Sequence, residues 1–370
     1  MGESGALRDV LHNMLQDSDL TFRDFVEVAL YHPRFGYYSR PGKGPGREGD
    51  FITAPLLSPL FSFALGRLVS EFLSRMGDAM CSIVDIGCGD GALIHALVEM
   101  TPPELRARAR FAGVDRSADR MPPSGEIVFA SDLASVPRGE AQLLLSNELF
   151  DAQPFARLVQ RDEHLHELWV TERDGALAWS EHEAERRYEE YFAERGIELA
   201  DGQFADVSLE WGALYDELCR FVSRGMIVTF DYGYPEAKLF SGRVRRFGTA
   251  AAYAHHQVSR DLLADPGEQD LTAHINFTDL ERTGGRNGFA TLLFERQARF
   301  LLSLGATEHP LLRPLDDAAI ASPDDALALR EAREDARRLV LPDGIGEEIR
   351  VLIQEKGTPD SRWSFQRKLF

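Results

Sequence analysis

Hydrophobic and polar positions follow two different periods along the chain. Over residues 1–32, and again over residues 56–76, apolar residues recur every three or four positions, which predicts amphipathic helices. From Cys81 onward short apolar runs alternate with stretches typical of helices; the runs are SIVDIG, ARFAGVD, EIVFAS, AQLLLSNE and GMIVTFDYG. Apolar strands that alternate with helices predict an α/β fold with a parallel sheet covered on both faces.

This rhythm is interrupted twice, and a loop rich in Gly, Pro and charged residues follows the first helices. The predicted division is residues 1–76 for N-terminal helices and a lid-like loop, 77–151 for the first part of the sheet, 152–215 for an insertion with a polar helix, 216–234 for a helix and the fifth strand, 235–285 for an insertion over the ligand side of the sheet, and 286–370 for the last strands and helices.

Composition narrows the classes of partner. The net charge of −19 argues against nucleic acid as the main partner, because phosphate binding needs clustered Lys and Arg. The three cysteines lack metal spacing, and no apolar run approaches the ~20 residues of a membrane span. The first twenty residues are typical of an amphipathic helix, not a signal peptide, so we expect a cytoplasmic protein. Whether this helix packs on the core or mediates a homodimer is left open.

The sequence VDIGCGDGALIHAL, residues 84–97, joins the first strand to a helix. Its glycines Gly87, Gly89 and Gly91 let the backbone pass close to a ligand, and the start of the helix offers free N–H groups. The same residues fit the dinucleotide fingerprint G-x-G-x-x-G/A, with Ala92 last. On this turn alone, a nicotinamide dinucleotide and S-adenosyl-L-methionine both remain open as cofactors.

Polar side chains at successive strand ends favour S-adenosyl-L-methionine. Asp85 precedes the first glycine, where a carboxylate suits a positively charged cofactor and repels a pyrophosphate. Asp115 closes the second strand, where ribose hydroxyls would bind, and Asp132 follows the third, where an adenine amino group would bind. Asn147 ends the fourth strand, in the crevice where open α/β sheets bind ligands. Each residue taken singly is also explained as a cap or turn residue.

Longer stretches resemble the MidA family of class I methyltransferases, which includes the mitochondrial complex I assembly factor. The similar stretches span most of residues 22–305: FRDFVEVALYHPRFGYY, GREGDFITAPLLSPLFSFALG, SNELFDAQPF, MIVTFDYGYP, RFGT, GEQDLTAHINFTDL and RQARFLLSLG. The resemblance implies a Rossmann-like class I methyltransferase sheet with an N-terminal helical region and helical insertions, and S-adenosyl-L-methionine as cofactor. It also implies a protein substrate, with arginine dimethylation linked to assembly of respiratory complex I.

An arginine acceptor needs carboxylates that localise its charge and take up a proton. Glu148 and Asp151 are therefore predicted to frame the acceptor nitrogen, with Asp270 and His274 approaching from the second insertion. Asp231 is a further candidate. A helix cap remains the alternative for Asp270, and a buried imidazole with satisfied hydrogen bonds remains the alternative for His274.

The early loop carries a second part of the predicted cofactor site. Asp50 and Thr53 are predicted to contact S-adenosyl-L-methionine, and Tyr37 and Tyr38 to fold with them across it as a lid that excludes water. A static, packed loop is the alternative. Two other functions also remain open: a small-molecule methyltransferase, which the segment AAAYAHH favours slightly, and a non-catalytic assembly factor that binds the same cofactor.

Overall fold

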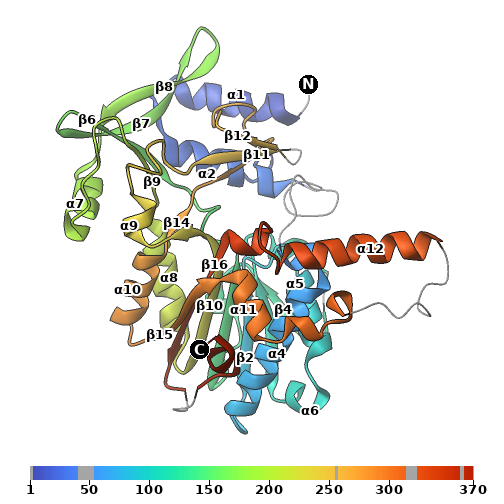
Figure 1. The fold of residues 1–370 in the computed structure, drawn as a ribbon. Coiled ribbons are helices and arrows are strands. Elements are labelled where there is room, and N and C mark those ends of the chain that lie inside the picture. The colour runs from blue at the N-terminus through green and yellow to red at the C-terminus, as the bar shows by residue number, and fades with distance from the viewer. Residues whose placement is uncertain are drawn as a thin grey trace. The chain divides into compact units, whose positions relative to one another are not determined.

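The chain divides into two compact units, each built from separated segments. The computed structural model describes residues 3–40, 54–122, 124–254, 257–313, 323–358 and 362–369 (Figure 1). Unit 1 comprises residues 1–51, 150–213 and 233–280, and unit 2 comprises residues 52–149, 214–232 and 281–370. Most of both predicted insertions therefore belongs to the same unit as the N-terminal helices.

Unit 2 contains the central sheet, whose main path has the order β15-β16-β10-β5-β2-β3-β4. The five strands from β10 to β4 are parallel, whereas β16 runs antiparallel between β10 and β15. The usual dinucleotide-binding order is 3-2-1-4-5-6, without such an antiparallel strand between the fifth and sixth. The strand bounds are β2 Cys81–Ile86, β3 Ala109–Val114, β4 Ile127–Ala130, β5 Ala141–Asn147, β10 Gly225–Tyr234, β15 Ala290–Arg296 and β16 Ile349–Lys356.

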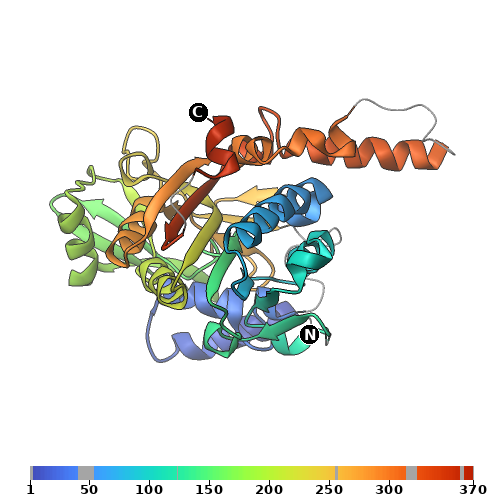
Figure 2. The same cartoon turned by 90° about the horizontal axis from the view of Figure 1, so that it is seen from below.

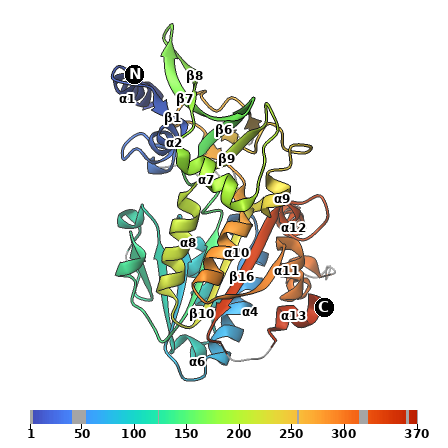
Figure 3. The same ribbon diagram turned by 90° about the vertical axis from the view of Figure 1, so that its left-hand side faces the viewer.

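Helices cover both faces of this sheet, as its continuously apolar strands require. On one face every second strand residue, such as Ile83 and Val351, packs in a core shared with α4 (Pro59–Arg75), α5 (Ala92–Met100), α11 (Gln297–Ser303) and α13 (Ser364–Leu369). The other face carries the unit-2 parts of α8 (Glu210–Phe221) and α10 (Phe277–Arg286), and Figure 3 shows α8 and α11 on opposite sides. The predicted α/β sheet is confirmed.

Three further helices complete unit 2: α3 Ala54–Leu57, α6 Pro103–Arg106 and α12 Pro323–Arg338. The long helix α12, orange in Figures 1 and 2, buries Ala336 near its C-terminal end. Leu327, closer to its start, is 56% exposed. Within the described ranges, no helix combines the length and the apolar character that crossing a bilayer demands.

Unit 1 combines helices with small antiparallel sheets. One sheet has the order β1-β7-β6-β9 with β8 added on β7, and another has the order β12-β11-β13. The bounds are α1 Glu3–Leu15, β1 Leu20–Thr21, α2 Phe22–Tyr31, β6 Ala156–Arg161, β7 His164–Arg173, β8 Ala176–Glu183, α7 Arg186–Arg195, β9 Phe204–Val207, α9 Glu236–Leu239, β11 Ala251–Ala254, β12 Gln257–Ser259, β13 Asp270–Thr272 and β14 Ile275–Asn276. The helix of the first insertion was predictable from the sequence pattern, but these strands were not.

The N-terminal helices bury their apolar faces in the core of unit 1. Thr21 caps α2, because its side chain accepts a hydrogen bond from the backbone N–H of Asp24 at 3.0 Å. Five apolar residues of α2 recur at helical spacing and are fully buried: Phe22, Phe25, Val26, Ala29 and Leu30. Leu7 and Leu11 of α1 are buried in the same core, so α1 packs on unit 1.

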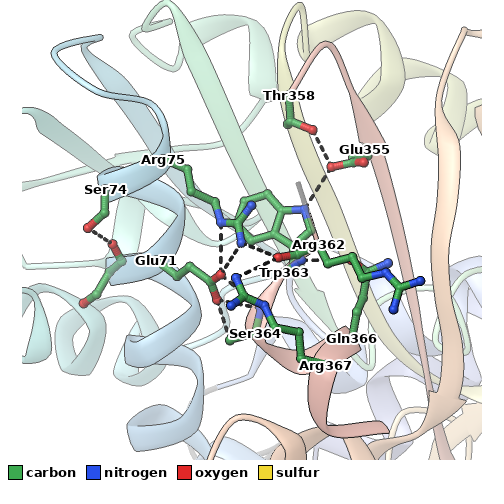
Figure 4. Close-up of polar contacts among 11 residues, drawn as sticks. Glu71, Ser74, Arg75, Glu355, Thr358, Arg362, Trp363, Ser364, Gln366 and Arg367 are labelled. Atoms are coloured by element: carbon green, nitrogen blue, oxygen red, sulfur yellow. Dashed lines mark hydrogen bonds and ion pairs between the residues drawn. The ribbon is translucent and has the colours of Figure 1, made fainter. Parts of the chain in front are cut away.

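A polar and aromatic cluster fixes the C-terminal helix of unit 2 to α4 (Figure 4). Glu71 on α4 accepts hydrogen bonds from the backbone N–H and the hydroxyl of Ser364, and two more from the guanidinium of Arg75, at 2.7 and 3.0 Å. The Arg75 guanidinium lies 4.2 Å from the ring centroid of the buried Trp363. The indole N–H of Trp363 donates to Glu355 on β16 at 3.0 Å. Glu71 is therefore the acceptor on which this cluster converges.

Replacing Glu71 by glutamine is expected to lower the free energy of unfolding of unit 2 by about 1–3 kcal/mol, because a neutral amide cannot accept all of these bonds or balance Arg75. Urea denaturation followed by circular dichroism measures this loss. The control is Glu99→Gln, at an exposed position of α5. Equal unfolding free energies for the two variants would contradict the importance of the cluster.

Candidate active site

Backbone hydrogen bonds hold the glycine turn between β2 and α5 in unit 2. The N–H of Gly87 donates to the carbonyl of Val114 at the end of β3, at 2.7 Å, and the N–H of Gly91 donates to Cys88 at 2.8 Å. Gly87, Gly89 and Gly91 have φ angles of 72°, 55° and 77°, in the left-handed region that favours glycine. The three glycines are therefore required by the path of the backbone.

Gly89 borders open space, whereas its two neighbouring glycines do not. A Cβ atom placed on Gly89 would meet no heavy atom of the described residues within 4 Å. At Gly87 it would come to 2.9 Å from Leu149, and at Gly91 to 3.0 Å from Phe129. The turn thus leaves room for a ligand on the side of Gly89.

Asp85 carries its carboxyl group into a buried position at the end of β2. Burial, with a smaller contribution from the neighbouring charges of Asp115 and Asp90, raises the pKa of Asp85 to about 8. None of the described Lys, Arg or His side chains forms an ion pair with it. A ligand that brings a positive charge next to Asp85 would therefore stabilise its ionised form.

Asp115 is tied to the glycine turn. One of its carboxylate oxygens accepts a hydrogen bond from the backbone N–H of Gly89 at 3.1 Å, and the other accepts from the N–H and hydroxyl of Ser117. Asp132, by contrast, is exposed and caps the short helix 133–135, accepting from the N–H and the hydroxyl of Ser135 at 2.9 Å each. The structure thus shows the cap role for Asp132, and its contact with adenine stays a prediction.

Asn147 presents a buried acceptor at the end of β5. Its side-chain N–H donates to Glu148 at 3.0 Å, but its carbonyl oxygen has no hydrogen-bond partner among the described residues. Leaving such an oxygen unsatisfied costs about 1–3 kcal/mol, which a ligand donor would recover.

Glu148 has a φ of 52°, a strained value for a residue with a side chain, and such strain is concentrated at functional sites.

Three of the predicted catalytic residues belong to unit 1, where a backbone hydrogen bond joins the segment of Asp151 to that of Asp270 and His274. The backbone carbonyl of Asp151 accepts a hydrogen bond from the N–H of Ala273 at 3.1 Å. Asp270, on β13, and Asp151 are both buried. The N–H of His274 donates to the hydroxyl of Thr249 at 3.1 Å. Asp151 is thereby fixed next to the segment that carries Asp270 and His274.

Tyr38 is a member of this group that the sequence analysis assigned only to a lid. Its hydroxyl donates to a carboxylate oxygen of Asp270 at 2.9 Å, and its ring stacks on Tyr31 with centroids 5.5 Å apart. Burial raises the pKa of Tyr38 well above its usual range, and the charges of Asp270 and Asp151 add to this rise. Tyr38 therefore remains a neutral donor that orients Asp270. Tyr37, beside it, is buried in the core of unit 1.

The remaining candidates are placed elsewhere or lie outside the described residues. Asp50 and Thr53 fall in the segment 41–53, which is not described. Asp231 is fully buried on β10, in register with Arg350 of β16, and its carboxylate accepts from the N–H of Tyr232. In the part of the chain that the structure describes, no three His, Cys, Asp or Glu side chains form a metal-binding cluster.

Comparison with known proteins gives a consistent set of relatives. The family model described as "Putative S-adenosyl-L-methionine-dependent methyltransferase" matches residues 64–294. The Drosophila melanogaster protein named "Protein arginine methyltransferase NDUFAF7 homolog, mitochondrial" is 26% identical over 315 residues, which cover 75% of this chain and 69% of the relative. The Homo sapiens protein named "Protein arginine methyltransferase NDUFAF7, mitochondrial" is 23% identical over 349 residues, which cover 81% and 73%.

A solved structure is similar over almost the whole chain. It is a COG1565 superfamily member from Burkholderia thailandensis bound to S-adenosyl-homocysteine, with a TM-score of 0.82, 26% identity, and coverage of 98% of this chain and 95% of that one. Features of unit 2 fit such a ligand: the open space at Gly89, the unsatisfied oxygen of Asn147 and the buried carboxyl of Asp85. Together with Asp115 they are the residues that would hold it.

Gly89→Arg is expected to weaken binding of S-adenosyl-homocysteine about a hundredfold or more, because the new side chain fills the open space. Gly77→Arg is the matched control, since Gly77 also has a positive φ (63°) and open space around it but lies outside the turn. Both variants carry a similar backbone strain of about 1–2 kcal/mol. Calorimetric affinities that fall equally in both variants would contradict this site.

The raised pKa of Asp85 predicts how the stability of the ligand-free protein depends on pH. Between the ordinary Asp pKa of about 3.9 and the native value, the folded chain holds a proton that the unfolded chain has released. Stability contributed by this proton is therefore lost as the pH rises towards about 8. The unfolding free energy of the natural chain, minus that of Asp85→Asn, should fall over this interval. A flat difference across it would contradict the buried carboxyl.

Proposed function

The chain belongs to the family of S-adenosyl-L-methionine-dependent methyltransferases, and we propose that it methylates an arginine side chain of a protein. The observation that carries this proposal is the acidic and aromatic group of unit 1, in which Tyr38 donates to Asp270 beside the buried Asp151. Buried carboxylates with a fixed donor suit a guanidinium group, which presents several N–H donors and a delocalised positive charge. The relatives named above as protein arginine methyltransferases support the same substrate.

The reaction sets the chemical demands on these residues. S-adenosyl-L-methionine, when bound, supplies a methyl group on a positively charged sulfur. Transfer forms a carbon–nitrogen bond to the guanidinium and breaks the carbon–sulfur bond, while sulfur leaves as a neutral thioether and the nitrogen gives up one proton. The protein must therefore hold the acceptor in line with the methyl group and accept that proton.

Asp151 and Asp270 are proposed to bind the acceptor guanidinium. Because both carboxyl groups are buried, their attraction for a cation is less screened than at the surface. The hydroxyl of Tyr38 fixes the rotamer of Asp270 through one of its oxygens. Glu148, with its strained backbone, and His274 are proposed as further groups that orient the acceptor or take up its proton.

The setting of the reaction is a further part of the proposal. A protein substrate that takes part in assembly of respiratory complex I agrees with the resemblance to the family of the assembly factor. Cys81, Cys88 and Cys219 are free and buried, which agrees with a reducing compartment such as the cytoplasm. Burial raises the pKa of the Cys88 thiol beside the glycine turn, so this group stays protonated and does not compete for the methyl group.

Asp151→Asn and Asp270→Asn are each expected to lower the rate of arginine methylation about a hundredfold, because each removes a charge that holds the guanidinium and a group that takes up its proton. Their affinity for S-adenosyl-L-methionine, measured by calorimetry, should stay within about twofold of the natural chain. The control is Glu183→Gln, at an exposed position of β8 in the same unit. Unchanged rates in both aspartate variants would remove them from the mechanism.

The rate is measured with isotope-labelled S-adenosyl-L-methionine and a cell extract treated to remove small molecules, followed by acid hydrolysis of the protein fraction. Label in methylated arginine supports the proposal. Label only in small molecules when they are added back would favour a small-molecule methyltransferase. Cofactor binding without any transfer would favour an assembly factor that acts by docking.

A further inference from the structure

One loop of unit 1 differs in character from the rest of this acidic chain. Residues 241–249, here called the arginine loop, connect α9 to β11 (Figure 1). Residues 238–249 contain four basic residues and no acidic one, although the whole chain has a net charge of −19. The four are Lys238, on α9 before the loop, and Arg243, Arg245 and Arg246 within it. The loop is therefore a local positive region on a negative protein.

The arginine loop also displays apolar side chains to solvent. Val244 is 71% exposed and Phe247 is 68% exposed, the two highest values among the large hydrophobic residues of the described chain. They are three positions apart and alternate with the arginines. Exposure of an aromatic ring beside arginines is typical of protein contact surfaces, in which Phe and Arg are enriched.

The four cations have no carboxylate partners within the described residues. Lys238, Arg245 and Arg246 instead contact backbone carbonyls or an aromatic ring. Arg245 donates to the carbonyl of Lys238 at 3.0 Å, and both side chains lie over the ring of Tyr234, at 3.9 and 4.3 Å from its centroid. Arg246 donates to the carbonyl of Asp201 at 3.1 Å. In a chain with more acidic than basic residues, this leaves the positive charge available to a partner.

A buried ion pair holds the arginine loop in a fixed conformation. Arg157 and Asp206 lie 2.6 Å apart, and the Asp206 side chain is fully buried. Asp206 also accepts hydrogen bonds from the backbone N–H groups of Thr249 and Ala250, while Arg157 donates to the carbonyl of Phe247 at 3.1 Å. A loop fixed in this way loses little conformational entropy when a partner binds.

We propose that the arginine loop docks an acidic protein segment that carries an apolar side chain. The carboxylates of the segment pair with the loop cations, and its apolar side chain packs on Phe247 and Val244. The inference deepens the proposed function by naming the chemistry of its protein partner, and rests on it only in taking that partner to be a protein.

The charge distribution favours a short protein segment over an extended polyanion. Electrostatic interactions fall off over about 8 Å at physiological salt, so a short segment on the loop experiences mainly the local cations. An RNA strand or an anionic membrane extends further and is repelled by the remaining acidic surface. Apolar Val244 beside Phe247 also suits an aliphatic or aromatic side chain better than a stack of bases.

The test is binding of a fluorescein-labelled peptide of repeated Glu-Glu-Phe units to the full chain, measured by fluorescence anisotropy without any methyl donor. The natural chain should bind this peptide, and binding should weaken as ionic strength rises. Arg243→Glu and Phe247→Ser should each weaken binding about tenfold. The first removes a cation that pairs with the carboxylates of the peptide, and the second removes the ring on which its apolar side chain packs. A Glu-Glu-Ser peptide should bind more weakly than the Phe-containing one.

Matched controls come from α12, which carries an exposed apolar residue, Leu327, and an exposed cation, Arg330. Leu327→Ser and Arg330→Glu should bind the peptide like the natural chain. The proposal is overturned if the natural chain does not bind the peptide, if all four variants bind it equally, or if single-stranded RNA or phosphatidylserine vesicles bind the loop more tightly. It is also overturned if Phe247→Ser converts a dimer to a monomer in sedimentation. Since no methyl transfer is measured, these outcomes are independent of the arginine acceptor.

Discussion

A carboxyl group buried at the end of β2, with no cation beside it in the described chain, is the constraint on which the candidate site depends. Asp85 keeps its proton near neutral pH because burial disfavours the charged form. Parallel strands end at one edge of the sheet, so the ends of β2, β3 and β5 gather Asp85, Asp115 and Asn147 there. A positively charged ligand stabilises the ionised form of Asp85, whereas a pyrophosphate would keep it protonated and gain no ion pair from it.

The buried carboxylates Asp270 and Asp206 organise unit 1 in a different way, because each has a donor within the protein. Asp270 is held by Tyr38, and Asp206 is held by Arg157 and two backbone N–H groups. Buried acidic groups that are satisfied fix the conformation of their segments. The bond from Tyr38 orients Asp270, which is proposed to bind the arginine acceptor. Asp206 positions the arginine loop. The chain thus uses a buried carboxyl group to attract a ligand in unit 2, and in unit 1 it uses Asp206 to position backbone.

The sequence predicted the parallel sheet because its strands are buried on both faces and appear as short apolar runs. The hairpin β7–β8 was missed, because polar residues on one face of its strands interrupt the apolar runs. Its turn residues Asp174 and Gly175, both with positive φ, are nevertheless a known hairpin signal. Strand ends placed Asp85 and Asp115 together. No spacing could connect Tyr38 with Asp270, because they are 232 residues apart and meet only through tertiary packing.

The most direct test of the central claim is isothermal titration of the full chain with S-adenosyl-L-methionine, with NADH as a parallel titration. The buried carboxyl of Asp85 and the open space at Gly89 predict micromolar binding of S-adenosyl-L-methionine and no binding of NADH. Tight binding of NADH would contradict the account, because the turn would then hold a pyrophosphate, an anion that gains no attraction from Asp85. Binding of neither compound would equally contradict the assignment of the glycine turn.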